Sequence, residues 1–444
     1  MLRRRSSLWL ALALVHCGPP AQPVTSQPGP VMPPDLKPVM ERFAPTQVPL
    51  GQAFGVSGFG GDSVPGAPPS TELDALASLH AGILRRDFTW SRIEPQPGTF
   101  DYSADDQAVE ALSQQGVALL GILDYSAKWS IANGDEHAAP DPALFAAYAK
   151  SVAAHYAGRV RYWEVWNEEN SGLTFWHPRQ DPAAYATLLV EAASAIREAD
   201  PAAHIVFGGL WWHDEGVVEA ATDFVEDAFA ARPDLARSFD VLAIHPYPAS
   251  YPGHVPPEAS QPPDVPVGLM VARMRAVLDA YGAKSTPIWA DEYGYPIYGA
   301  VDEAAQARWL VRATVELLAS GADEVSVFTL RDGPHPDLFP PEDAFGLLHY
   351  DGTPKRAFSA LTTLLGFDPG ARLAADESAG PVRAYRFEGP RARFHVLFAP
   401  DESPHPFTLA APPGSQVLDE LGNPPPGISL PSLVVSGDPL YVLE

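Results

Sequence analysis

Eight short apolar segments alternate with eight longer amphipathic segments across residues 49–365, and this alternation constrains the fold more than any other feature. Such alternation is typical of parallel α/β proteins, in which each helix leads back to the next parallel strand. Eight consecutive units predict a (β/α)8 TIM barrel of class α/β. The expected strands are 53–57, 82–88, 117–123, 159–166, 204–209, 239–245, 287–292 and 324–330. The expected helices are 71–81, 104–115, 141–158, 181–200, 216–231, 266–281, 302–320 and 353–365.

The helix ends support this division of the chain. Asp141-Pro142 and Asp181-Pro182 each combine an acidic cap with proline in the first turn, a common way to begin a helix. The alternative is an open, doubly wound sheet, which would need a glycine-rich phosphate turn after its first strand. Gly58-Phe59-Gly60-Gly61 matches that turn only weakly, so the barrel is the favoured fold.

Two of the expected strands end in carboxylates. Residues 163–170 read Trp-Glu-Val-Trp-Asn-Glu-Glu-Asn, and residues 287–294 read Pro-Ile-Trp-Ala-Asp-Glu-Tyr-Gly. Acids at a strand end can simply begin a solvated loop. In a barrel, however, the carboxyl ends of all strands meet at one face, which would bring Glu168 and Glu292 together. A pair of carboxyl groups is what the cleavage of a glycosidic bond requires.

Other chemically capable side chains follow the same strands. Sugar sites combine carboxylates with aromatic rings, because pyranose CH faces stack on rings while hydroxyls take directed hydrogen bonds. The acids Glu169 and Asp291 compete with Glu168 and Glu292, but adjacent side chains of an extended segment alternate faces, so one of each pair is expected to point inward. The further candidates are Arg85 or Arg86, Trp129, Asn167, Trp211, His245 and Tyr247.

Residues 50–366 resemble the clan A (4/7 superfamily) retaining glycoside hydrolases, in particular their β-xylosidase-like and cellulase-like members. The motifs that carry the resemblance are Trp166-Asn167-Glu168, His245-Pro246-Tyr247, Trp289-Ala290-Asp291-Glu292-Tyr293-Gly294, the segment 85–102, and Phe345-Gly346-Leu347-Leu348 with Gly352-Thr353-Pro354-Lys355. Two details differ from the clan pattern. Asp291 stands where a small hydroxyl residue is common, and no tryptophan ends the eighth strand.

The resemblance implies a role for each site residue. Glu168 would be the acid/base and Glu292 the nucleophile, with Tyr247 supporting Glu292. Asn167 would bind the sugar 2-hydroxyl, while Arg85 and His245 would order the pocket. Arg85 matches the position in the clan better than Arg86 does. A raised pKa is expected for Glu168, because a second negative charge lies nearby.

The N-terminus is typical of an exported protein. Residues 1–17 contain Arg3-Arg4-Arg5, a short apolar run and Cys17, which is the single cysteine of the chain. The segment Leu14-Val15-His16-Cys17-Gly18 resembles a bacterial lipoprotein cleavage box, so Cys17 is a candidate lipidation site. Ordinary secretion is the alternative. Residues 18–48 are rich in proline and predict an extended linker.

Charge and composition limit the partners. The formal net charge is −26, and it becomes −29 without residues 1–16, with 26 basic against 55 acidic residues. This argues against nucleic acid and anionic lipid as partners, so a membrane would be reached only through a lipid anchor. We expect a monomer that binds a carbohydrate substrate. We expect neither a cofactor nor a metal, because His213, Asp214, His245 and His335 show no metal-binding spacing.

Residues 366–444 contain short alternating segments separated by proline and glycine, which predict a small antiparallel β-sandwich domain. A structural domain packed on the barrel is favoured over an independent carbohydrate-binding module, because no aromatic stripe is evident. The sequence as a whole predicts a retaining glycoside hydrolase that acts on a poly- or oligosaccharide by double displacement. The alternative hypotheses are a non-catalytic glycan-binding surface lipoprotein on the same barrel and, less favoured, a metalloenzyme.

Overall fold

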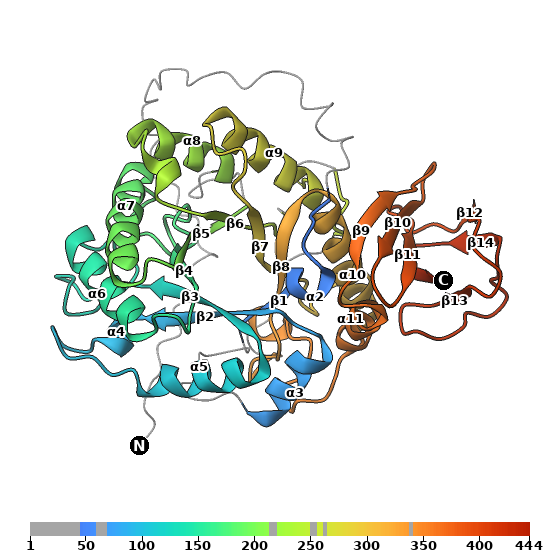
Figure 1. Cartoon of the computed structure of the whole chain (residues 1–444), viewed down its shortest axis with the longest axis horizontal. Coiled ribbons are helices and arrows are strands. Elements are labelled where there is room, and N and C mark those ends of the chain that lie inside the picture. The colour runs from blue at the N-terminus through green and yellow to red at the C-terminus, as the bar shows by residue number, and fades with distance from the viewer. Residues whose placement is uncertain (1–44, 59–68, 213–219, 249–254, 261–263, 337–340) are drawn as a thin grey trace.

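The computed structural model describes residues 45–58, 69–212, 220–248, 255–260, 264–336 and 341–444 (Figure 1). The predicted signal peptide with Cys17, and the linker up to residue 44, lie outside the described residues. So do His213, Asp214 and the glycine-rich stretch after residue 58. Among the described helices, none is both long and apolar enough to cross a membrane.

Eight parallel strands close into a barrel in chain order, which confirms the predicted fold class. Figure 1 shows the strands in the centre with the helices around them. The strands are β1 Phe54–Ser57, β2 Ile83–Thr89, β3 Ala118–Asp124, β4 Tyr162–Asn167, β5 His204–Trp211, β6 Val241–His245, β7 Ile288–Tyr293 and β8 Ala322–Phe328. The helices are α2 Leu50–Ala53, α3 Ser70–Ser78, α4 Trp90–Ile93, α5 Ser103–Gln115, α6 Pro142–His155, α7 Pro182–Ala199, α8 Ala221–Ala231, α9 Val267–Ala280, α10 Glu303–Ala319 and α11 Arg356–Phe367.

The helices begin at the expected caps. The carboxylate of Asp141 accepts hydrogen bonds from the backbone N–H groups of Ala143 and Leu144, and proline occupies the first turn of α6. Asp181 caps α7 in the same way. These caps satisfy backbone donors that have no partner within the helix. Helix α8 is shorter than predicted, since its described part begins at Ala221 and residues 213–219 lie outside the described part of the chain.

The barrel interior consists of an apolar layer beneath a charged layer. The apolar layer contains Ile83, Leu120, Val206, Val241, Ala243 and Trp289, with Tyr162 packed against it. Residues two positions further along a strand share its inward face, because side chains alternate between faces. The inward positions that follow Ile83, Tyr162 and Trp289 are therefore Arg85, Glu164 and Asp291, all of them buried. Strands β2, β4 and β7 thus each supply an apolar side chain to the core and a charged one to the site end.

The C-terminal region forms two antiparallel sheets, in agreement with the predicted β domain. A five-stranded sheet has the order β13-β15-β11-β10-β9, and a two-stranded sheet pairs β12 with β14. The strands are β9 Arg372–Asp376, β10 Arg383–Glu388, β11 Arg393–Phe398, β12 His405–Thr408, β13 Gln416–Leu418, β14 Ser432–Val435 and β15 Leu440–Leu443. The Arg-Leu-Ala-Ala-Asp segment of β9 contains few strand-favouring side chains, so its sequence alone does not indicate a strand.

This β domain packs against α10 and α11, as Figure 1 shows on the side of the barrel near β8. Leu373, Phe394 and Tyr441 belong to the same apolar cluster as the buried residues of α10 and α11. The guanidinium of Arg312, fully buried in α10, donates to Glu402 at 3.1 Å and to the carbonyl oxygen of Pro400 at 3.3 Å. The contacts support the interpretation of this domain as a structural part of the barrel.

Arg312 also joins a third segment, because it donates to both carboxylate oxygens of Glu258, which follows β6. We predict that Arg312→Ala lowers the free energy of unfolding by about 3–5 kcal/mol, since Glu258 would remain buried without its partner. Arg308→Ala is the matched control on the same helix. Arg308 is more exposed, and its loss should cost about 0–1 kcal/mol. Equal costs in chemical denaturation of the two variants would contradict a central role for Arg312.

Candidate active site

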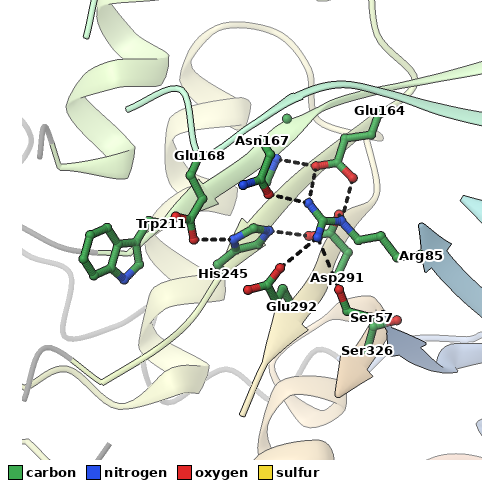
Figure 2. A network of polar contacts seen from close by, with 12 residues as sticks. Ser57, Arg85, Glu164, Asn167, Glu168, Trp211, His245, Asp291, Glu292 and Ser326 are labelled. Atoms are coloured by element: carbon green, nitrogen blue, oxygen red, sulfur yellow. Dashed lines mark hydrogen bonds and ion pairs between the residues drawn. The ribbon is translucent and has the colours of Figure 1, made fainter. Parts of the chain in front are cut away.

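Glu168 and Glu292 meet at the carboxyl end of the barrel, as Figure 2 shows. Glu168 directly follows β4, and Glu292 lies near the end of β7. One oxygen from each carboxylate and one ring nitrogen of His245 lie within 4.8 Å of one another. Both carboxylates retain some exposure, with 10% of the Glu168 side chain and 15% of the Glu292 side chain accessible. The two glutamates that the sequence selected therefore form a close, accessible pair.

Two donors hold Glu292, one on each oxygen. The Nη1 atom of Arg85 donates to Oε2 at 2.8 Å, and the hydroxyl of Tyr247 donates to Oε1 at 2.9 Å. Arg85 comes from β2, while Tyr247 lies two residues beyond β6. A carboxylate with a guanidinium and a hydroxyl on opposite oxygens is fixed in orientation.

Glu168 has a different environment. Its Oε1 lies 2.8 Å from Nδ1 of the buried His245. Burial raises the pKa of Glu168, and the charge of Glu292 acts in the same direction, although the contact with His245 opposes the shift. The backbone is also unusual here, since Trp166 and Glu168 have φ values of +74° and +49°. Non-glycine residues adopt such values at a cost, and they cluster at functional sites.

Arg85 connects the members of this network. Its Nε and Nη2 atoms donate to the two oxygens of Glu164 at 2.7 and 2.8 Å, and Nη2 also donates to Oδ1 of Asn167 at 2.7 Å. Nε lies 3.3 Å from Asp291. A guanidinium that is only 3% exposed needs this compensation, because burial of an unpaired charge is very costly.

The side-chain contacts also distinguish Arg85 from Arg86 and define the orientation of the Asn167 amide. Arg86 points to the other face of β2, where its Nη2 atom lies 3.9 Å from Asp105, so Arg85 is the arginine of the site. With its Oδ1 accepting from Arg85, Asn167 directs its Nδ2 group to the hydroxyl of Tyr125 at 3.1 Å. This arrangement fixes the amide of Asn167 beside Glu168.

The two candidate tryptophans lie in different surroundings. Trp211 ends β5, pairs with His245 of β6, and exchanges backbone hydrogen bonds with the side chain of Asn170. Figure 2 shows its indole at the Glu168 end of the network. The indole of Trp129 donates to the carbonyl oxygen of Glu94 at 2.7 Å and packs edge-on against Trp90. Trp129 is thus anchored to the segment after β2, and its role toward a ligand stays a prediction.

The expected alternation of adjacent acids is wrong for one of the two pairs. Glu169 is fully buried against Gly208, consistent with a position outside the glutamate pair. Asp291 and Glu292, by contrast, both contact Arg85. The pairing of β7 with β8 is irregular between Ala290 and Tyr293, so the strict two-residue alternation is lost there. Asp291 lies in the floor beneath Glu292 and is completely buried.

Glu164 is the site residue that the sequence analysis missed. It was treated as part of an apolar strand, yet it is fully buried and binds Arg85 through both oxygens. The signal was present, since a carboxylate inside a buried strand requires a partner and Arg85 occupies the equivalent position in β2. Burial raises the pKa of Glu164 to about 7 despite the charge of Arg85.

Two groups of side chains in the described part of the chain have the spacing of a metal site. They are Glu164, His245 and Asp291, and Glu168, His245 and Glu292. Both groups depend on His245, whose two ring nitrogens already face carboxylates. Arg85 supplies a further positive charge between the acids. The charge that a metal ion would provide is therefore supplied by protein side chains.

The chain is similar to known glycosyl hydrolases. The family model described as Cellulase (glycosyl hydrolase family 5) matches residues 46–332. Endo-1,4-beta-xylanase A of Phanerodontia chrysosporium is 28% identical over 123 residues, which are 26% of this chain. The aligned region is 29% of that protein, so the chain spans less than a third of the curated relative it matches.

Solved structures share the fold at low sequence identity. A family 39 glycoside hydrolase from the gut symbiont Bacteroides cellulosilyticus WH2 has a TM-score of 0.71 and 18% identity, covering 89% of this chain and 82% of its own. A family 39 beta-xylosidase from Caulobacter crescentus has a TM-score of 0.60 and 18% identity, covering 91% and 98%. The match to the family 5 model confirms the predicted resemblance to clan A glycoside hydrolases. Because the family model covers more than half of the residues, the chain belongs to the cellulase family of glycosyl hydrolases, family 5.

Proposed function

We propose that the protein is a retaining glycoside hydrolase that cleaves O-glycosidic bonds of a poly- or oligosaccharide by double displacement. The main support is the separation of Glu168 and Glu292, whose nearest carboxylate oxygens lie within 4.8 Å. Retaining enzymes place their two carboxyl groups about 5–5.5 Å apart, whereas inverting enzymes need about 6.5–9.5 Å to admit a water molecule. The spacing therefore favours direct attack by one carboxylate.

The two environments assign the two roles. Glu292, held by Arg85 and Tyr247, attacks the anomeric carbon while protonated Glu168 gives its proton to the departing oxygen. Glu168 is then a carboxylate and takes a proton from water. The resulting hydroxide attacks the same carbon, and Glu292 leaves as a carboxylate. The raised pKa of Glu168 suits this exchange, because the group must carry a proton at the start of each cycle.

The surrounding residues would bind the sugar. Asn167 is proposed to bind the 2-hydroxyl beside the reacting carbon, and its contacts with Arg85 and Tyr125, which orient the amide, support this role. Trp211 at the Glu168 end offers a ring for stacking. Arg85, His245 and Tyr247 act mainly by fixing the two glutamates, and Trp129 is proposed for a more distant part of the substrate.

The identity of the sugar that the enzyme cleaves has to be determined with a panel of substrates. The curated relative is a xylanase by name, so aryl β-xylosides are the first substrates to test, followed by aryl β-glucosides and β-mannosides. We propose that the protein acts as a monomer without a cofactor. No observation favours the alternative of a non-catalytic glycan-binding protein, because Glu168 and Glu292 are both present and oriented.

We predict that Glu292 forms the covalent glycosyl-enzyme intermediate. A fluorosugar with a good leaving group and the preferred configuration should label the peptide that contains Glu292, as measured by mass spectrometry after digestion. Glu292→Gln should remove both the label and turnover, because an amide cannot attack the anomeric carbon. Label on Asp291 in the wild-type protein would contradict the assignment.

Glu168→Ala should slow hydrolysis of glycosides with poor leaving groups by ~10²–10⁴-fold, since these depend on protonation in the first step. Activated aryl glycosides should lose much less in that step, and added azide should restore part of their turnover. Steady-state kinetics on both substrate types tests this prediction. Glu169→Gln is the neighbouring control, and it should show no azide rescue. Equal losses on both substrates without rescue would exclude Glu168 as the acid/base.

We also propose that the chain is exported and either lipid-anchored through Cys17 on a bacterial membrane or secreted. The support is the sequence of residues 1–17 and the proline-rich linker that follows. A chain anchored at Cys17 would hold the barrel away from the membrane surface through this linker.

Cys17→Ser should move the protein from the membrane fraction to the soluble exported fraction, because the thiol that carries the lipid is lost. Immunoblots of fractionated cells and metabolic labelling with a clickable fatty acid measure the change. His16→Ala is a useful companion, since it restores a small residue to the cleavage box. Unchanged fractionation and no lipid label in the wild-type protein would indicate simple secretion.

A further inference from the structure

His245 lies between two carboxylates. Its Nδ1 is 2.8 Å from Oε1 of Glu168, and its Nε2 is 3.4 Å from Oδ1 of Asp291 (Figure 2). The ring is completely buried at the end of β6, and Asp291 is completely buried in β7. Each ring nitrogen therefore faces an acid. The number of protons on the ring decides whether each nitrogen donates a hydrogen bond to its acid or accepts one from it.

A neutral imidazole carries one N–H and cannot serve both acids. If the proton were on Nε2, toward Asp291, then Nδ1 would accept a hydrogen bond from protonated Glu168. The proton that a leaving group needs would then be directed at the ring. If both nitrogens carry protons, Nδ1–H donates to Glu168, and the acid's own proton is free to point at the substrate.

The charges around the ring favour the doubly protonated form. Asp291 and Glu292 of β7 face it together with Glu168, an oxygen of Glu164 lies within 4.8 Å of a ring nitrogen, and Glu169 also acts on the ring through its charge. Arg85 from β2 opposes them. Burial lowers the pKa of His245, but Glu292, Asp291 and Glu168 more than offset this and raise the pKa to about 10. Gly209 of β5 packs against the ring, and a Cβ at this position would lie 1.9 Å from Nε2.

The negative charge of Asp291 is balanced by nearby positive charges rather than by close hydrogen bonds. Its two oxygens are buried without a close hydrogen-bond partner. The cationic atoms facing it are Nε of Arg85 at 3.3 Å and Nε2 of His245 at 3.4 Å, both ionic contacts. Arg85 is already paired with Glu164 and Glu292. A neutral ring would leave Asp291 sharing a single cation with two other acids, which is costly in a buried site.

We propose that Asp291 is a positioning residue that holds His245 doubly protonated, so that Nδ1–H donates to Glu168 throughout the catalytic cycle. This inference rests on the proposed function. The imidazolium stabilises the carboxylate form of Glu168, which must exist after the first step and act as a base in the second. A serine or threonine at position 291, the kind of residue common in the clan, has no charge with which to maintain this state.

Nitrogen-15 NMR of protein labelled in its histidine side chains tests the protonation state directly, whether or not a substrate is known. His245→Gln identifies the His245 signals by their loss. In the wild-type protein both ring nitrogens should be protonated from pH 5 to 8, about the range in which an unperturbed histidine loses its charge. In Asp291→Asn the pKa of His245 should fall into this range, because the opposite charge 3.4 Å from Nε2 is lost, so the ring should lose one proton as the pH rises from 5 to 8.

Two further variants make the test specific. Asp291→Ser should behave like Asp291→Asn, which guards against an effect of the asparagine amide or a folding defect in one variant. Glu324→Gln is the control, because Glu324 is also buried in the barrel but accepts its hydrogen bond from Ser326 and makes no contact with His245. Its histidine signals should match the wild type. A neutral His245 in the wild-type protein, or an unchanged imidazolium in both Asp291 variants, would overturn the proposal.

The pH profile gives a second readout. With a neutral ring beside it, Glu168 loses a stabilising charge on its ionised form, so its pKa should rise. The alkaline limb of kcat/KM, which reports the loss of the acid's proton, should therefore move to higher pH in Asp291→Asn. An alkaline limb at the wild-type pH, despite a neutral His245, would refute the link to Glu168. If no glycoside is hydrolysed, the proposed function fails, and the NMR result still decides the state of His245.

Discussion

The buried guanidinium of Arg85 is the interaction on which the rest of the site depends. It donates to Glu164 of β4 and Glu292 of β7, lies 3.3 Å from Asp291, and fixes Asn167 as well. A charge in this position is stable only with its partners, and the partners are stable only with it. Three strands that are distant in the chain are therefore held in one register by the same ion that orients the proposed nucleophile.

The site is a continuation of the barrel core. Inward positions on β2, β4 and β7 are apolar in one layer and charged in the next, with Ile83, Tyr162 and Trp289 beneath Arg85, Glu164 and Asp291. The apolar layer excludes water from below, which strengthens the electrostatic interactions above it. Rigid strands, rather than loops, then place the charges, so the geometry around Glu292 is set largely before any ligand arrives.

Most of the fold was predictable, because hydrophobic periodicity and helix caps are local signals. The eight strands were placed within a few residues, and Asp141 and Asp181 cap their helices as expected. The two glutamates were also predictable, since strand ends in a barrel converge. Glu164 was missed and Asp291 was treated as a rival, because their roles depend on pairing across the barrel. The irregularity in β7 that lets Glu292 reach Arg85 together with Asp291 has no local signature in the sequence.

Two chemically identical side chains receive different tasks through their neighbours. Glu292 faces a guanidinium and a tyrosine hydroxyl, which favour a fixed carboxylate. Glu168 is attached to a backbone with a φ of +49° and faces His245, while burial raises its pKa. The difference between them is therefore set by Arg85 on one side and His245 on the other. Asp291 lies 3.3 Å from Arg85 and 3.4 Å from His245, which makes this fully buried acid the link between the two halves of the site.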